Sequence, residues 1–520
     1  MSVFGIDLGT TYSCVASCDP KGHVEMLTFE REKNPTIPSV VAFQDDGTPF
    51  VGQKAKNGLM INAEKSIDAV KREMNSEYCE KELIINGVLR RLSPIEPSSC
   101  ILRHLYYNAN KTLKYIYNES ETNKVVVTIP AAFNDSQREK TKLAAELAGM
   151  EVLGLLQEPT AAAIAYNIKP EETILVFDLG GGTLDVSVVK YEKERNNSYT
   201  VLGTPAGDVH LGGKDWDEAL VLHALRKANV DPDKIDKHGR YWALLMHEAE
   251  NRKIELSSNL ETQFSITLPG ITQIVPIRRS EFETITASLV RRAIKIVEKA
   301  ISNAKNAEID RFVLVGGSSR MPMIIKTLEK EFLCKISNHR LLKDWISLED
   351  PDFAIAKGAA KYAGMLNNKN NDNINVNDKT TRSYGFKAMR QSKEIVINII
   401  YSDDNCVVDN RSFTLTTRRD NQEKMDIVIV ENDSIEDEIA FDCFNPLIQK
   451  SLVLPHNTPK GTGVDFIVSR DKNGIVHVEA GCGKNILSFQ AKEVAEDYII
   501  KQVKETIQKM INKENKINQQ

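Results

Sequence analysis

The sequence predicts a multidomain protein in which an α/β part is followed by an all-β part and then by one C-terminal helix. Up to about residue 366, strand and helix patterns alternate around three glycine-rich loops, which is typical of α/β architecture. Between 383 and 490, short alternating segments are separated by turns, which is typical of an all-β domain. From 491 onward, apolar residues recur at helical spacing with charged residues between them.

The composition indicates an ordinary globular protein of a few domains, with 520 residues, 41% hydrophobic and 27% charged. A net charge of −5 gives no electrostatic reason to expect nucleic acid or an anionic membrane as a partner. Residues 2–16 lack the features of a secretory signal, and no apolar run reaches membrane-spanning length. The eight cysteines are scattered and form no zinc pattern, so we expect buried free thiols and a cytoplasmic protein.

The central motif of the chain is residues 175–187, LVFDLGGGTLDVS. An apolar strand leads through Asp178 into Gly180, Gly181, Gly182 and Thr183, and Asp185 opens a second strand. A plain hairpin turn needs only one or two glycines, whereas consecutive glycines let backbone N–H groups and a hydroxyl approach a phosphate. Two carboxylates at such a loop are explained if a hydrated divalent cation lies between them and the phosphate.

A second copy of this motif begins near the N-terminus, in residues 4–16. It has the same order of strand, Asp7, Gly9, Thr10 and Thr11, and strand. Asp7 and Asp178 are 171 positions apart, about one domain's length. One such loop alone is weak evidence, but the pair predicts a duplicated core that holds one nucleotide from both sides.

The remaining α/β elements follow from apolar periodicity and turn residues. Strands are expected within 3–16 and 24–52, and at 124–130, 152–156, 262–277 and 311–315. Helices are expected at 53–75, 98–117, 134–149, 161–166, 241–256, 280–305 and 354–364. Further glycine-rich loops are expected at 206–217 and 316–322.

In the all-β part, strands are expected at 394–401, 411–417, 425–430, 464–469, 475–480 and 486–490. An Asn-, Asp- and Lys-rich stretch at 367–380 separates this part from the α/β part and is interpreted as a linker. The last helix carries an apolar stripe, which we expect to cover one flank of the β domain; its members are Val494, Tyr498, Val503, Ile507 and Met510.

Two charged residues have both an ordinary and a functional interpretation. Glu158 stands at a strand end before a proline and a helix, which suits an active site, but an acid in a first helical turn also favours the helix dipole. Lys71 lies in a predicted helix, where lysine is normally solvated surface charge.

Taken together, these motifs resemble the DnaK-type 70-kDa heat-shock protein (chaperone) family. The match is strong over residues 1 to about 366 and moderate over 383–490. The most specific segments are GIDLGTTYS, IPAAFNDSQR, EPTAAAIAY, FDLGGGTLDVS, GDVHLGG, LVGGSSRMP and DPDFAIAKGAA. The resemblance implies an actin-like (duplicated ribonuclease-H-like) ATPase domain at 1–366, a linker at 367–382, a peptide-binding β-sandwich at 383–490 and a truncated lid at 491–520.

The resemblance also implies roles for individual residues. Catalysis would use Asp7, Lys71, Glu158, Asp178, Thr183 and Asp185, with magnesium held mostly through water by Asp7, Glu158 and Asp178, and with potassium nearby. ATP or ADP would be bound by Gly9, Thr10, Thr11, Tyr12, Gly180, Gly181, Gly182, Gly212, Gly213, Glu250, Lys253, Ser257, Gly316, Gly317, Ser318, Arg320 and Asp352. Extended apolar peptides would contact Phe386, Met389, Leu415, Met425 and Ile427. Pro130, Arg138 and Asp378 would couple the domains, and a J-domain co-chaperone and a nucleotide-exchange factor would be partners.

The sequence departs from the family pattern at four places. Gly154 replaces an arginine that contacts the J-domain partner, and the aliphatic linker is diluted to Ile374–Asn377. Arg418 replaces a small or aromatic residue that arches over the peptide. The lid is reduced to one helix.

Two other functions fit parts of the sequence. A sugar kinase on the same core would need a base for the substrate hydroxyl and would leave the β domain without a role. A nucleotide-locked adaptor would bind ATP and partners with little turnover. Steady-state ATP hydrolysis with and without unfolded peptide separates the three hypotheses.

Overall fold

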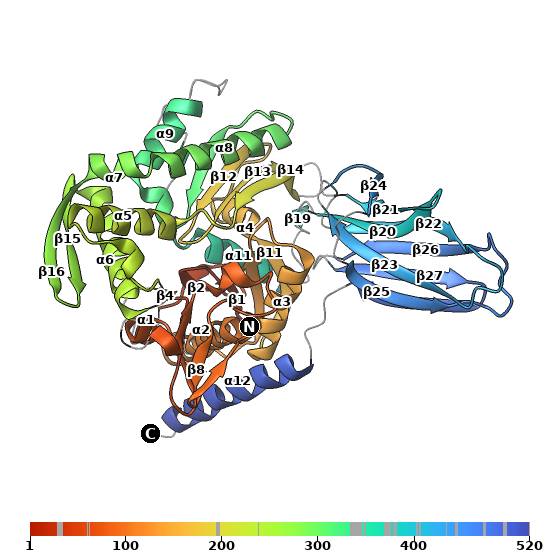
Figure 1. The fold of residues 1–520 in the computed structure, drawn as a ribbon, viewed down its shortest axis with the longest axis horizontal. Coiled ribbons are helices and arrows are strands. Elements are labelled where there is room, and N and C mark those ends of the chain that lie inside the picture. Colours follow the sequence, from red (N-terminus) through yellow and green to blue (C-terminus); the bar gives the residue numbers. More distant parts are fainter. Residues whose placement is uncertain are drawn as a thin grey trace.

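The computed structural model describes the chain except residues 29–34, 60, 62, 194–197, 238, 333–345, 348–349, 369–375, 378–381, 402–403, 405–406, 433, 442–445, 472–474, 492–496 and 519–520. An N-terminal α/β part (residues 1–368) lies beside a C-terminal pair of sheets (residues 383–491), and one long helix, α12, returns to the N-terminal part (Figure 1). The mixed α/β, multidomain architecture expected from the sequence is therefore confirmed.

Two six-stranded sheets form the centre of the N-terminal part, and five strands of each share one arrangement. The first has the order β11-β10-β1-β2-β3, with β4 also paired to β2, and the second has the order β18-β17-β12-β13-β14-β19. In each, an antiparallel meander (β1-β2-β3 or β12-β13-β14) is extended on its first strand by two parallel strands. The first sheet comprises β1 (Val3–Asp7), β2 (Tyr12–Cys18), β3 (Val24–Met26), β4 (Thr36–Pro38), β10 (Lys124–Ile129) and β11 (Glu151–Gln157). The second comprises β12 (Thr173–Leu179), β13 (Leu184–Glu192), β14 (Ser198–Asp208), β17 (Arg311–Val315), β18 (Ile346–Ser347) and β19 (Val376–Asn377).

Two helices, α4 (Glu158–Ala165) and α11 (Ala354–Asn367), pack between these sheets in one shared core. Their small residues allow very close approach. A Cβ on Gly358 would lie 1.8 Å from the Ala161 carbonyl oxygen, and one on Gly5 would lie 1.9 Å from the Ala360 nitrogen. Since real Cβ atoms do not come this close, glycine is required at both positions.

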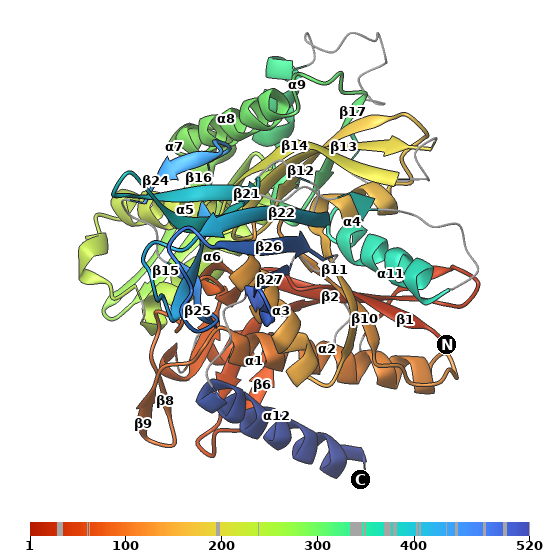
Figure 2. The same ribbon diagram turned by 90° about the vertical axis from the view of Figure 1, so that its right-hand side faces the viewer.

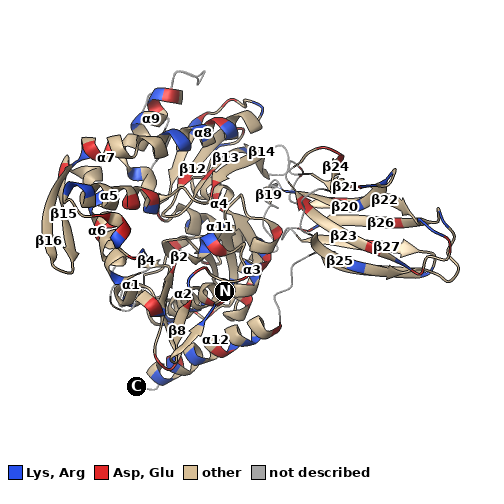
Figure 3. Cartoon of the chain, in the orientation of Figure 1, with Lys and Arg blue, Asp and Glu red and all other residues tan. Residues whose placement is uncertain are grey.

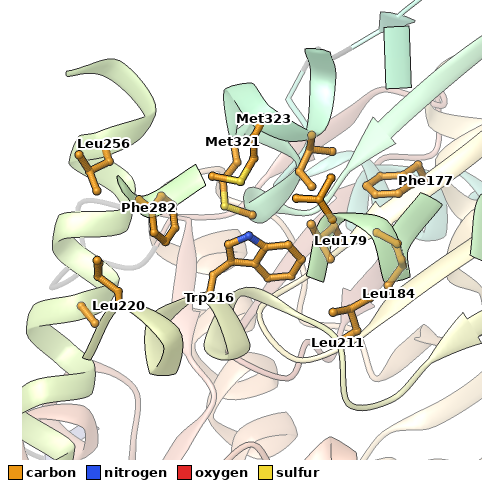
Figure 4. Close-up of a cluster of buried hydrophobic side chains, with 14 of the residues drawn as sticks. Phe177, Leu179, Leu184, Leu211, Trp216, Leu220, Leu256, Phe282, Met321 and Met323 are labelled. Carbon is orange, nitrogen blue, oxygen red and sulfur yellow. The ribbon is translucent and has the colours of Figure 1, made fainter. Parts of the chain in front are cut away.

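A large apolar cluster supports the second sheet from its other face (Figure 4). Trp216, fully buried at the start of α5 (Gly213–Lys227), lies among Leu179, Leu184 and Leu211. Because Leu179 and Leu184 flank the glycine loop 180–183, this packing fixes the position of the loop.

The other elements of the N-terminal part surround the sheets. The helices are α1 (Gln53–Leu59), α2 (Ile95–Tyr115), α3 (Asp135–Leu147), α6 (Arg240–Ser258), α7 (Arg279–Ile285), α8 (Ala287–Asn303) and α9 (Pro322–Phe332). The short strands are β5 (Val40–Phe43), β6 (Pro49–Val51), β7 (Ser66–Asp68), β8 (Leu83–Ile85), β9 (Val88–Arg90), β15 (Glu261–Leu268) and β16 (Ile271–Arg278). The prediction of a cap at Asn134 is confirmed, since its side chain and that of Gln137 bond reciprocally to backbone N–H groups.

Two helix predictions are wrong in part. The described residues within 53–75 form the short helix α1, a 3₁₀ turn (Ala63–Lys65), strand β7, and a second 3₁₀ turn (Val70–Glu73) that carries Lys71. The left-handed backbone of Ala69, with φ of 55°, interrupts any continuous helix before Lys71. The helix expected at 280–305 divides at Thr286, whose hydroxyl donates to the Phe282 carbonyl.

The C-terminal pair consists of a five-stranded and a four-stranded antiparallel sheet that share one core. The first contains β20 (Ser383–Arg390), β21 (Lys393–Ile400), β23 (Lys424–Asn432), β24 (Glu438–Ala440) and β25 (Pro446–Val453), and the second β22 (Val408–Thr416), β26 (Gly463–Arg470), β27 (Val476–Cys482) and β28 (Asn485–Ala491). The rings of Phe386, Phe413 and Phe466 pack against one another between the sheets, with centroids 4.8–5.5 Å apart. Strands β20, β24 and β25 lie outside the predicted strand segments.

Part of the predicted linker forms a strand. Val376 and Asn377 pair in parallel with Tyr199 and Thr200, at the edge of the second sheet. Ile374 and Asp378 lie outside the described residues.

The expectation that the last helix covers the β domain is wrong. Helix α12 (Asp497–Asn518) runs along α2 of the N-terminal part instead (Figures 1 and 2). Ile499, Val503, Ile507 and Met510 are buried in the core that contains α2, whereas Tyr498 is 41% exposed and Val494 lies outside the described residues. Arg103 and Glu514 form an ion pair, and Thr506 donates to the buried Glu96. Charges of both signs mark the exposed side of α12 (Figure 3).

The five cysteines that the structure describes, Cys14, Cys18, Cys79, Cys100 and Cys482, are buried and free, as expected. In the described part of the chain, no helix is both long and apolar enough to cross a membrane.

We expect Ile507→Ala to weaken the docking of α12, because large-to-small changes at buried isoleucines typically cost about 2–5 kcal/mol. Hydrogen exchange of the α12 amides measures this, with Ile517→Ala, at a position 47% exposed on the same helix, as the matched control. Equal protection of α12 in both variants would show that the packing on α2 does not hold this helix.

Candidate functional site

The two glycine-containing hairpins predicted from the sequence touch one another. A Cβ on Gly181 would lie 1.9 Å from Thr11 Oγ1, and one on Gly182 would lie 2.3 Å from Thr10 Cγ2. Only glycine therefore fits at these two positions of the second hairpin. The Thr11 hydroxyl is buried and has no hydrogen-bond partner among the described residues, so it is available to a ligand.

Four carboxylates gather at the base of these hairpins. Asp7 ends β1, Asp178 and Asp185 are directly opposite each other on β12 and β13, and Glu158 begins α4 where β11 ends. Glu158, Asp178 and Asp185 are 3–7% exposed. Matching strand ends of the two sheets thus bring together acids that are far apart in the sequence.

The electrostatics of this group are unusual. Burial, followed by the charge of Glu158, raises the pKa of Asp7 to about 7 and that of Asp185 to about 7. Burial and the same neighbour raise the pKa of Asp178 well above its ordinary value. Burial of Lys71 acts to lower its pKa, but Glu158, Asp7 and Asp178 together raise it above its ordinary value.

One lysine does not balance four carboxylates, so the group favours a further positive charge. Carboxylate oxygens are the ligands that Mg²⁺ prefers, usually with several retained waters. Among the described residues, no three acidic, histidine or cysteine side chains are placed to coordinate one ion together. The donor set therefore fits a magnesium ion held through its water shell.

The opposite side of the cleft carries the residues predicted to hold the nucleoside. Glu250, Lys253 and Ser257 follow one face of α6, and the loop 316–320 faces them together with Asp352. Gly316 has a φ of 77°, and a Cβ there would lie 2.4 Å from the Leu179 carbonyl oxygen. Arg320 Nη2 lies 2.9 Å from Asp352 Oδ2.

A cavity of about 700 Å³ joins these two groups. The predicted residues that line it are Asp7, Gly9, Thr10, Thr11, Tyr12, Lys71, Glu158, Asp178, Gly180, Gly181, Thr183, Glu250, Lys253, Ser257, Gly316, Gly317, Ser318, Arg320 and Asp352. Four predicted residues stand outside the lining, namely Gly182, Asp185, Gly212 and Gly213. Gly182 and Gly212 instead pack backbone to backbone, with the Cβ position of Gly212 2.4–2.6 Å from Gly182 atoms.

Three residues of the site were missed from the sequence. Lys56 donates to the Tyr12 hydroxyl over 2.9 Å and pairs with Glu250, so it bridges the mouth of the cleft. Arg72 donates through Nε to the Gly182 carbonyl over 2.9 Å. No pattern in the sequence indicates either contact, because both join distant segments.

Asp217 is the third missed residue, and it lies on α5 at the end of the glycine-rich segment 206–217. It lies 2.8 Å from Lys253 Nζ, and burial raises its pKa to about 6 despite that lysine. Its position shortly after Gly212 and Gly213, which the family resemblance assigns to nucleotide binding, was a signal that could have found it.

The predicted peptide-binding residues are less well gathered. Phe386 and Ile427 are buried in the core of the C-terminal sheets, and Leu415 and Met425 pack partly buried against it. Met389 is 36% exposed at the far end of β20.

Of the predicted coupling residues, Pro130 is buried after β10, and Arg138 on α3 is buried with Nε donating to the Phe133 carbonyl. Gly154 lies on β11, the edge strand of the first sheet.

Comparison with known proteins agrees with this geometry. A family model described as Hsp70 protein matches residues 3–520. "Chaperone protein DnaK" of Thermosipho melanesiensis is 35% identical over 505 residues, which cover 93% of this chain and 79% of the relative. "Chaperone protein DnaK" of Thermosipho africanus is 34% identical over 505 residues, which cover 93% and 78%. The chain belongs to the Hsp70 family of ATP-dependent molecular chaperones.

Proposed function

We propose that the chain binds Mg²⁺ and ATP in the cleft between its two matching sheets, hydrolyses ATP there, and thereby controls the binding of extended apolar peptides by its C-terminal sheets. The observation that carries this proposal is the contact between the two glycine hairpins above three buried carboxylates and the partly buried Asp7. ATP and ADP would share the cavity.

For the architecture, we propose an actin-like ATPase domain of two duplicated lobes at residues 1–366. The common order and direction of five strands in each of the two six-stranded sheets support this division. Residues 367–382 would be the linker and 383–490 a β-sandwich that binds peptide, whereas α12, within the expected lid segment 491–520, packs on α2 instead of on these sheets. The shared core of the two C-terminal sheets supports the sandwich.

Each group of site residues has a proposed role. Bound magnesium would neutralise charge that develops on the phosphates, with Asp7, Glu158 and Asp178 holding its waters and Asp185 helping to organise potassium. Thr10, Thr11, Thr183 and the loop glycines would donate to phosphate oxygens. Lys71 would hold the attacking water in position, which is the main protein contribution to a phosphoryl transfer of this kind.

Glu250, Lys253 and Ser257 would hold the nucleoside against Gly316, Gly317, Ser318, Arg320 and Asp352. The structure supports this because all eight line one cavity. Lys253 is already oriented by Asp217, so its ammonium group is fixed before a ligand arrives.

We propose unfolded or extended apolar peptides as clients, bound near Phe386, Met389, Leu415, Met425 and Ile427. A J-domain co-chaperone and a nucleotide-exchange factor are the proposed partners, and the buried free thiols support a reducing compartment such as the cytoplasm.

The direct test is steady-state ATP hydrolysis with and without a leucine-rich peptide. We expect hydrolysis that the peptide accelerates, and Lys71→Ala should lower the rate roughly 10²-fold while sparing ATP binding, since the attacking water loses its orienting group. Lys21→Ala, at an exposed lysine remote from the cleft, is the control. Near-normal turnover in Lys71→Ala would remove the role assigned to Lys71, and no turnover in the unmodified chain would favour the adaptor hypothesis.

Gly154→Arg tests the proposed J-domain surface. A Cβ at Gly154 meets only Leu366 Cδ1, at 3.6 Å, so an arginine fits on this edge strand. A charged hydrogen bond from it can contribute ~1.5–3 kcal/mol to a partner's docking. We expect weak stimulation of the unmodified chain by a generic J-protein and stronger stimulation of the variant, measured as ATP turnover. Robust stimulation of the unmodified chain, or no gain in the variant, would contradict this prediction.

A further inference from the structure

The C-terminal sheets meet the N-terminal part at a buried ion pair. Arg470 is the last residue of β26, and Asp135 is the first residue of α3. Arg470 Nη2 lies 2.8 Å from Asp135 Oδ1, and the two side chains are 1% and 3% exposed. Figure 3 shows acidic residues on α3 and at the near ends of the facing strands. The junction between the two parts is therefore charged and shielded from water.

A second carboxylate, Glu431 of β23, faces the same place with its side chain 16% exposed. Its charged and titratable neighbours come from each element packed around it. They are Asp135 of α3, Tyr384 of β20, Arg382 just before β20, and Arg470 of β26. The Tyr384 hydroxyl lies 3.5 Å from Glu431 Oε1, and Arg382 Nε lies 3.7 Å from the same oxygen.

These contacts do not neutralise Glu431 in full. Arg470 bonds directly to Asp135, and Arg382 is 34% exposed, so water weakens its attraction for Glu431. If the C-terminal sheets leave α3, both carboxylates regain water and Glu431 loses Asp135 as a neighbour. Docking therefore penalises the charged form of Glu431, and the neutral form avoids this cost.

We propose that docking of the C-terminal sheets onto α3 is coupled to the uptake of one proton by Glu431, so that mildly acidic conditions favour the docked arrangement.

The direction and range of the effect follow from linkage. Burial, followed by the charge of Asp135, raises the pKa of Glu431 to about 7 in the docked structure. A carboxyl group with a raised pKa stabilises the docked state fully below its ordinary pKa, near 4.3, and this contribution is lost as the pH rises to about 7. Between these limits the docking equilibrium falls by at most about tenfold per pH unit, and it is flat at higher pH.

Small-angle X-ray scattering of the full chain tests the proposal through the radius of gyration between pH 5 and 8, at fixed salt. We expect the wild-type chain to expand as the pH rises toward 7. Glu431→Gln, which mimics the protonated side chain, should stay compact over the whole range. Glu436→Gln, a neutralisation at an exposed position beyond the same strand, should behave like the wild type.

Other groups also titrate in this range, including Asp7 and Asp185 in the cleft, whose pKa values are raised to about 7 by burial and by the charge of Glu158. They are present in all three proteins, so the difference between the wild type and Glu431→Gln isolates Glu431. The same pH dependence in both would overturn the proposal, as would a compact Glu436→Gln chain at every pH.

Arg382→Ala provides a second measurement that does not require a change at Glu431. Since Arg382 favours the charged form of Glu431, its removal should move the midpoint of the expansion to higher pH. An unchanged or lower midpoint would also overturn the proposal.

Discussion

The gathering of four carboxylates, three of them buried, beside a single buried lysine is the constraint on which the rest of the structure depends. Asp7, Glu158, Asp178 and Asp185 each lie at or within one residue of the end of a regular element, and two sheets with five strands in a common arrangement place those ends together. Isolated buried charges of one sign are costly, and Lys71 offsets only part of that cost. In the proposed function, a hydrated cation would complete the balance of charge and would lie between these acids and the phosphates of the nucleotide.

The supporting structure has the rigidity that such a site needs. The core around Trp216 fixes the glycine loop from one side, and the small residues of α4 and α11 fix the distance between the sheets from the other. At the far side of the molecule, α12 extends the core on α2, so the C-terminal segment stabilises the N-terminal part. The buried pair Arg470–Asp135 then connects the C-terminal sheets to the same framework.

Much of the fold and of the cleft could be predicted from the sequence, because these features depend on residues that are close together in the chain. Paired Asp-Leu-Gly hairpins, a capped helix at Asn134 and short alternating strands leave strong patterns within ten or twenty residues. The duplication was visible because its two copies share residue types at matching positions.

The features that could not be predicted depend on contacts between residues that are distant in the sequence. Tertiary packing alone decides whether the apolar stripe of α12 contacts the C-terminal sheets or α2. The same holds for the contact between Lys56 and Glu250, which are 194 positions apart in the sequence. The turn that carries Lys71 was mistaken for part of a helix because the left-handed backbone at Ala69 has no glycine to mark it.

The most direct test of the central claim is isothermal titration calorimetry of ATP into the full chain, with Mg²⁺ and with the metal removed by EDTA. If the carboxylates require a cation beside the phosphates, ATP should bind one site per chain with Mg²⁺ and at least tenfold more weakly without it, a difference of about 1.4 kcal/mol or more. Equal affinity under both conditions would contradict the account, because the buried acids would then have no role in holding the nucleotide.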